Sequence, residues 1–512
     1  MTGVASVTAV RAYVRARGRS GRTWSDRYTG LIGLTLAVLI TAPAVGTALS
    51  AVPREVDTSR ACAGVALLAL LLAGALSAAR ASGPVAVPAA DAAWLVLSPL
   101  PRRGVLGRTA LILVGVSVVA GAALGVGLLT VLGSRDQAVL RLLAALVLGV
   151  ATMAGGMSAA VLAQTSERWD AWLTGGISVI VVSAGIAAIM SFGPGSHLAA
   201  SVSSAPPSAV LAAATASVMP AAGLTVRAWT ALGRIPARTV LDASTRTGHA
   251  AAAAVMMDPG ALTWIVEDAH WRGRSLRSRP WPSGLARGLV PARARGPLAV
   301  SWQEWRRLAR RPVRVALLVS STLLPALAAR ATTDVAGNGV PAVAAVVLGV
   351  GALAVAASAT TGARRDGEDP ALARLLGVGP RALLAARAVL PALLGGGWLV
   401  AALTVLGTAG ALPAGPWWLL GVACAPALAA GALRMARRRP VDHAMPVLNT
   451  PVGALPTGPV LWALTGVDVA VLGCAPTLTT LIGGVSAGLL AAQAVSGAAV
   501  LAAYLGLGGH RY

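Results

Sequence analysis

The chain contains no lysine, so all 42 of its basic residues are arginine. This absence excludes two kinds of chemistry. A phosphate-binding loop of the Walker A type needs a lysine that reaches the nucleotide phosphates, and Schiff-base catalysis needs a lysine amine. The 512-residue chain therefore carries no conventional ATPase of its own. Its arginine and alanine bias is typical of a GC-rich genome.

Cysteine and acidic residues are also scarce. The three cysteines, Cys62, Cys424 and Cys474, are far apart in or beside apolar runs, which predicts neither a disulfide framework nor a zinc site. Only 18 residues are acidic, and Asp468 is the one that we place inside a predicted membrane span. We expect it near the outer end of that span, hydrated or capping, rather than in a proton relay. We therefore expect no catalytic residue, no metal and no cofactor, and we interpret the chain as not an enzyme.

Apolar residues dominate what is present. The chain is 56% hydrophobic and 12% charged, with a mean hydropathy of +0.74, more apolar surface than a soluble fold of this length could bury. We predict an all-α polytopic membrane helix bundle of about 12 transmembrane helices in two related six-span halves. The predicted spans cover about residues 29–50, 61–81, 108–132, 138–164, 171–191, 208–230, 313–331, 340–361, 387–411, 417–435, 459–474 and 478–505.

Composition changes once along the chain, and this divides it into three parts. Residues 1–230 are the first six-span half. Residues 231–312 form a linker rich in arginine, tryptophan and proline, and residues 313–512 are the second six-span half. Alternate loops place 37 of the 42 arginines on one side of the membrane. By the positive-inside rule we expect a multi-pass protein of the cell membrane, with both termini and the linker cytoplasmic.

The net charge of +24 need not indicate nucleic acid, because positive charge on cytoplasmic loops follows from membrane insertion and contact with anionic lipid. We expect membrane lipids, and no nucleic acid, as partners. The end of the linker supports this. Leu298, Trp302, Trp305 and Leu308 recur at helical spacing. Arginines that include Arg306 and Arg307 fill the other face, which predicts an interfacial helix that stops at Pro312.

A short basic motif occurs twice, 279 residues apart, each time just before an apolar span. The matched pairs are Pro101 with Pro380, Arg102 with Arg381 and Arg108 with Arg387. The repeat indicates two related halves. The alternative is a chance match between two loops of an arginine-rich chain.

Small residues recur inside the predicted spans. Gly121 and Gly125 lie in the span over 108–132, where glycines allow close helix packing. Gly484-Val-Ser486-Ala-Gly488 matches the nucleophile-elbow pattern. It falls inside the last predicted span, with no strand before it, so we interpret it as a helix-packing motif as well.

The order of these features resembles the permease subunit of type-2 ABC exporters. An interfacial helix and two spans precede a cytoplasmic Pro-Arg loop, and four more spans follow. The phrase Leu97-Ser98-Pro99-Leu100-Pro101-Arg102-Arg103 is similar to one that many such permeases carry before span 3, and the second copy is degraded. Two units are fused here, as in permease-like proteins of GC-rich bacteria. The resemblance implies that the ATPase is a separate chain, which docks on the cytoplasmic loops.

We therefore expect an inner-membrane permease subunit of an ABC-type exporter, powered by a separate ATP-binding subunit. The six motif residues are the candidate docking surface, and ordinary positive-inside anchoring is the alternative role for them. A twelve-span secondary transporter and a non-transporting membrane scaffold remain open as other functions.

Overall fold

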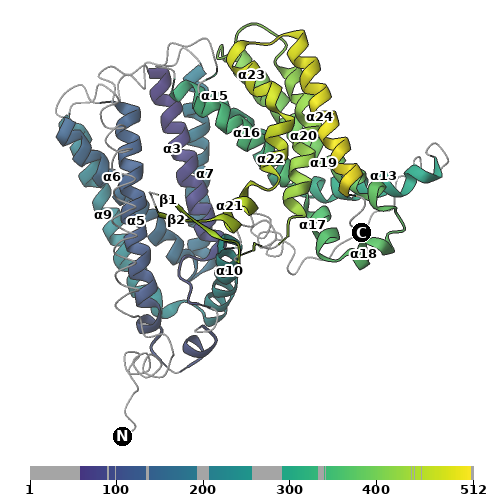
Figure 1. Cartoon of the computed structure of the whole chain (residues 1–512). Coiled ribbons are helices and arrows are strands. Elements are labelled where there is room, and N and C mark those ends of the chain that lie inside the picture. Colours follow the sequence, from purple (N-terminus) through teal and green to yellow (C-terminus); the bar gives the residue numbers. More distant parts are fainter. Residues whose placement is uncertain are drawn as a thin grey trace. The chain divides into compact units, whose positions relative to one another are not determined.

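The computed structural model describes residues 58–88, 92–98, 100–133, 138–192, 207–255, 291–332, 340, 342–439, 441–442, 444–450 and 453–508. Within them the protein is helical, apart from one short hairpin (Figure 1). Nine helices of this part are long and apolar enough to cross a membrane, and a bent helix pair adds a tenth if it counts as one span. These are the helices of a multi-pass membrane protein, as the composition predicts. The predicted span over 29–50 lies outside the described residues.

The chain divides into two compact units, Met1–Gly248 and His249–Tyr512. Five predicted spans of the first unit are single long helices, because each is an uninterrupted apolar run of the required length. The elements of this unit are α3 (Thr58–Ser82), the π-helix η1 (Ala92–Val96), α5 (Arg102–Leu132), α6 (Ala138–Ala163), α7 (Glu167–Phe192), α9 (Pro207–Ala231), the 3-10 helix η2 (Leu232–Arg234) and α10 (Ala237–Val255).

Glycines bring α5 and α6 into backbone contact. A Cβ atom at Gly121 would lie 2.5 Å from the Cα atom of Val150, and one at Gly149 would overlap the carbonyl oxygen of Gly121. Gly125 meets the backbone of Ala145 in the same way. The predicted packing role of Gly121 and Gly125 is thus confirmed. Helices in a membrane gain stability from such close approach, because the hydrophobic effect does not drive them together there.

The second unit contains more, shorter helices. Its elements are α13 (Ala292–Ala309), α14 (Pro312–Ser320), η3 (Ser321–Leu323), α15 (Leu324–Ala331), α16 (Ala342–Ala357), α17 (Thr361–Glu368), α18 (Pro370–Leu375), α19 (Pro380–Thr408), α20 (Trp418–Ala436), β1 (Val447–Thr450), β2 (Gly453–Pro456), α21 (Thr457–Leu464), α22 (Val467–Gly473), α23 (Ala475–Gly483) and α24 (Ala487–Gly508). Helices α16 and α17 meet at a bend of 58°. Strands β1 and β2 pair antiparallel, Val447 opposite Pro456.

The packing order of the first unit recurs in the second. Helix α19 packs along α20 as α5 packs along α6. Helix α24 lies against α20 as α9 lies against α6, and α16 contacts α19 and α20 as α3 contacts α5 and α6. Small residues again allow close contact between the two central helices, α19 and α20, since a Cβ at Gly421 would meet the backbone of Val400. The units differ at α7, a single helix whose place in the chain order is taken by α21, α22 and α23.

The chain between Thr457 and Gly508 differs from the prediction. Two spans were expected, over 459–474 and 478–505, but the structure has three short helices before α24. Gly466 (φ 97°) and Gly484 (φ 91°) adopt the left-handed region, which ends a helix and which other residues rarely enter. Gly484 therefore separates α23 from α24, and the interpretation of Gly484–Gly488 as a packing motif within one helix is wrong.

A buried glutamine bonds both helix ends at another junction in this segment, between α22 and α23. Gln493 of α24 is 0% exposed. Its Nε2 donates to the carbonyl oxygen of Gly473, at the end of α22 (2.7 Å), and its Oε1 accepts from the backbone N–H of Thr477, in the first turn of α23 (3.1 Å). The Thr477 hydroxyl also donates to Gln493 (2.8 Å) and lies 3.0 Å from the Cys424 thiol. These bonds satisfy helix-end groups that water cannot reach.

Candidate functional site

Helix α13 packs against α19 in the second unit. The predicted helix is confirmed over Ala292–Ala309, and Pro312 begins the next helix, α14. The buried face carries Glu304 and Leu308, with Val300 one turn earlier. Of the apolar stripe that the sequence predicted on this helix, only Leu308 lies on this buried face. Leu298 is 43% exposed and Trp305 is 46% exposed, as expected for a helix that turns an apolar face toward lipid.

A buried ion cluster joins α13, α17 and α19. Arg387 of α19 is 8% exposed. Its Nε and Nη2 donate to both carboxylate oxygens of Asp366 in α17, at 2.8 and 3.0 Å. Its Nη1 donates to Glu304 Oε1 in α13, at 2.7 Å. One guanidinium therefore pairs with two carboxylates, and its planar geometry suits the bidentate contact with Asp366.

Glu304 is the member of this cluster whose hydrogen bonding is incomplete. Burial raises its pKa from the ordinary 4.5 to about 7, although the charge and hydrogen bond of Arg387 act in the opposite direction. Its Oε2 is buried without a hydrogen-bond partner in the described structure. Gly362 makes room for the cluster, since a Cβ there would overlap both Arg387 Nη1 and Glu304 Oε1. The Glu304 carboxyl can therefore take up a proton near neutral pH.

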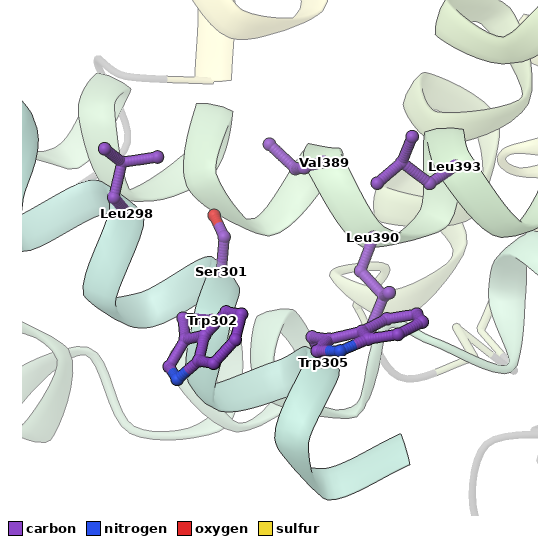
Figure 2. A pocket seen from close by; sticks show the side chains of 7 residues that line it. All are labelled: Leu298, Ser301, Trp302, Trp305, Val389, Leu390 and Leu393. Carbon is purple, nitrogen blue, oxygen red and sulfur yellow. The ribbon is translucent and has the colours of Figure 1, made fainter. Parts of the chain in front are cut away.

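An apolar hollow of about 370 Å³ lies beside the cluster (Figure 2). It is lined by Leu298, Ser301, Trp302 and Trp305 of α13 and by Val389, Leu390 and Leu393 of α19. Figure 2 shows Leu390 pointing toward the Trp305 ring. The one hydroxyl in the lining is already used, since Ser301 Oγ donates to the Ala386 carbonyl (2.8 Å). The hollow therefore suits a hydrocarbon group.

The first motif copy lies where α5 begins. Arg102 is the first residue of α5 and Pro101 is its exposed N-cap residue. Arg102 Nη1 donates to the carbonyl oxygen of Ile235 (3.1 Å), so this side chain has a structural partner. Arg108, two turns on, is exposed. Arg103 lies over the Trp229 ring, with its Cζ atom 5.6 Å from the ring centroid.

The loop before this motif is held by the unit itself. The N–H of Val85 donates to Gln164 Oε1 (3.2 Å), at the end of α6, and the N–H of Val87 donates to Ser244 Oγ of α10 (3.1 Å). Arg80 pairs with both carboxylate oxygens of Asp170 (2.6 and 2.7 Å). These bonds attach the described part of the loop to α6 and α10, and the end of α3 to α7.

The second motif copy opens α19, with Pro380 as its first residue. Pro380 and Arg381 are exposed, whereas Arg387 is buried in the ion cluster. The six predicted docking residues thus divide by environment. Pro101, Arg108, Pro380 and Arg381 face outward, while Arg102 and Arg387 bind groups of their own unit.

Asp468 lies elsewhere than predicted. Its Oδ1 accepts from the N–H groups of Gly466 (2.7 Å) and Val469 (2.8 Å), and its Oδ2 pairs with Arg434 (2.9 Å). The side chain is 46% exposed, and the two N–H bonds confirm the expected capping. Because Arg434 is in the last turn of α20, however, Asp468 lies at the basic end of that helix and not at the predicted outer end.

Sequence reasoning missed Glu304 and Asp366 as partners of Arg387. They are 83 and 21 residues from it. One feature of the sequence could have pointed to Glu304. Acidic residues are scarce in this chain, and an acid between Trp302 and Trp305 is unexpected on an interfacial helix. Within the described ranges no group of three or more His, Cys, Asp and Glu side chains could hold a metal ion.

The fold and this site define a multi-pass helical membrane protein with a buried ion cluster beside an apolar hollow. The chain belongs to DUF6297, a family of unknown function, whose model matches residues 56–446, about three quarters of the chain. The match spans both copies of the Pro-Arg motif. No curated protein and no solved structure matches the chain.

Proposed function

We propose that the protein is the permease subunit of an ABC-type exporter, built from two related six-span halves and powered by a separate ATP-binding subunit. The observation that carries this proposal is the recurrence of one packing order in both units, with α5–α6–α9 matched by α19–α20–α24. Each central pair begins at a Pro-Arg motif, because α5 starts at Arg102 and α19 at Pro380. Two equivalent helix starts would give two equivalent docking points.

The distribution of charge within each unit supports the proposed orientation. In the first unit, arginines gather where α3 ends and α5 begins, while Arg60 and Arg141 mark the other end. In the second unit they gather where α19 begins and α20 ends, while Arg330, bonded to the Ala409 carbonyl (3.0 Å), marks the other end. The basic ends are cytoplasmic by the positive-inside rule. The count of twelve spans belongs to this proposal, as does the cytoplasmic position of both termini.

The exposed motif residues would bind the ATP-binding subunit. The guanidinium groups of Arg108 and Arg381 can form bidentate hydrogen bonds with carboxylates of that subunit. Arg102 and Arg387 act differently, since each holds its own unit together. The absence of lysine agrees with an external ATPase, because the chain cannot form a Walker A loop.

Co-purification tests the proposal. The tagged chain is co-expressed with each ABC-type ATP-binding subunit of its source genome that has no permease of its own. One of these subunits is expected to co-purify with the parent chain and to be lost from an Arg108→Gln/Arg381→Gln variant. The control, Arg60→Gln/Arg141→Gln, removes the same charge from the opposite end of the first unit and should retain the subunit. Failure of every subunit to bind the parent would refute the proposal.

A second candidate, a proton-coupled secondary transporter, is favoured by Glu304. This carboxyl is buried, touches a buried arginine and has a pKa of about 7, which are the properties of a coupling acid. Under this alternative, Glu304→Gln would abolish transport driven by a proton gradient. Under the permease proposal, the same variant would retain ATP-dependent activity.

A further inference from the structure

The hollow between α13 and α19 has a mostly carbon lining and lies partly open. Leu393 is 64% exposed and Val389 is 43% exposed, and both belong to α19, a helix able to span a membrane. Trp302 and Trp305 form the opposite wall on α13. The material that covers exposed apolar side chains of a membrane helix is lipid hydrocarbon. The hollow is therefore placed to receive an acyl chain.

Positive charge adjoins one end of this hollow. Arg306 follows Trp302 by four residues and Arg310 follows Arg306 by four, so Arg306 lies one turn beyond Trp302, not on the opposite face as the sequence pattern predicted, and Arg310 lies one turn further. The rise of an α-helix places them about 6 and 12 Å beyond Trp302 along the axis. Arginine pairs phosphate oxygens in two-pronged fashion. An apolar hollow that leads into paired arginines matches a molecule with a hydrocarbon tail and an anionic phosphate head.

We propose that the α13–α19 hollow is a binding site for an anionic phospholipid. One acyl chain occupies the space between Trp302, Trp305 and Leu393, and the phosphate binds Arg306 and Arg310. This inference goes beyond the proposed transport function and does not depend on it.

Occupancy by this lipid would bear on the position of α13. The neighbouring face of the helix carries Glu304, which ties α13 to Arg387 of α19. The lipid and the ion cluster would both hold α13 against α19. The site would therefore make the packing of this helix sensitive to the anionic lipid content of the membrane.

Photolabelling of the full chain tests the site. The purified protein is reconstituted in phosphatidylcholine vesicles that contain a few per cent of phosphatidylglycerol with a diazirine in one acyl chain. Adducts are mapped by mass spectrometry after irradiation. We expect labelling of the segments 298–305 and 389–393, and competition by unlabelled phosphatidylglycerol but not by added phosphatidylcholine.

Two variants separate the tail contact from the head contact. Leu393→Trp fills the hollow and should remove these adducts, whereas Leu317→Trp, at a position of equal 64% exposure on α14, should not. Arg306→Gln/Arg310→Gln should weaken competition by phosphatidylglycerol about thirtyfold, since each arginine near a lipid headgroup adds attraction to it.

The matched charge control is Arg374→Gln/Arg439→Gln, at two exposed positions elsewhere in the unit, and it should compete like the parent. Adducts that persist in Leu393→Trp would overturn the proposed tail site. Equal competition by the two lipids in the parent would overturn the headgroup selectivity.

Discussion

Loss of the Asp366 carboxylate should destabilise the second unit more than any surface charge change nearby. Asp366 accepts two of the three hydrogen bonds that Arg387 donates to side chains in the cluster. Arg387 is 8% exposed in the parent, and in Asp366→Ala its guanidinium keeps Glu304 as its remaining acid. Removal of one partner from a buried ion pair costs about 3–5 kcal/mol. Because Glu304 remains, we expect the lower end, about 3 kcal/mol.

The same helix supplies a control. Glu368 pairs with Arg364 at 2.8 Å, but its side chain is 61% exposed. Solvent screens such a pair, so Glu368→Ala should cost at most about 0.5 kcal/mol. Both variants remove one carboxylate from α17, so both change its net charge by the same amount. The difference between them therefore isolates burial.

Thermal unfolding in detergent measures this difference. For a unit of this size, about 3 kcal/mol corresponds to a fall in Tm on the order of 6 °C. The fraction of fluorescently tagged protein that stays monodisperse after heating gives the apparent midpoint. Equal midpoints for Asp366→Ala and Glu368→Ala would refute the structural role of the ion cluster.

Three further outcomes are expected. Burial raises the pKa of Glu304 to about 7, so its contribution to stability is complete below the ordinary 4.5 and is lost as pH rises through 7; Glu304→Gln should flatten this pH dependence of the Tm. Gly149→Ala should lower the Tm by several degrees, whereas Gly115→Ala, with open space around it, should not. A thiol reagent applied outside cells should label Ser203→Cys but not Ser283→Cys, and the reverse would refute the twelve-span topology.

Most membrane helices could be predicted because their signal is local. A run of about 20 apolar residues implies a helix wherever it occurs, and α3, α5, α6 and α7 each follow from such a run. The breaks within 457–508 could not be predicted in this way. Gly466 and Gly484 adopt positive φ, and the junction of α22 with α23 is bonded by Gln493, up to 20 residues further on; hydropathy registers neither feature.

The candidate site could be predicted only in part for the same reason. The motif residues Arg381 and Arg387 and the amphipathic helix with Trp302 were visible as patterns. Their relation was not, because the ion cluster depends on α13, α17 and α19 packing together. A spacing of six between two arginines says nothing about which one turns inward. Arg387 is buried, whereas Arg108, its match in the first unit, is exposed. The difference results from the acids of the second unit, because the residue that matches Asp366 in the first unit is Val87, which carries no charge.

ATP hydrolysis by the reconstituted complex tests the central claim most directly. The full chain and its co-purifying ATP-binding subunit are placed in vesicles, and phosphate release is compared with that of the subunit alone. If the chain is an ABC-type permease, the parent stimulates hydrolysis, Arg60→Gln/Arg141→Gln retains this stimulation and Arg108→Gln/Arg381→Gln loses it. Hydrolysis that is the same with and without the parent chain would contradict the claim.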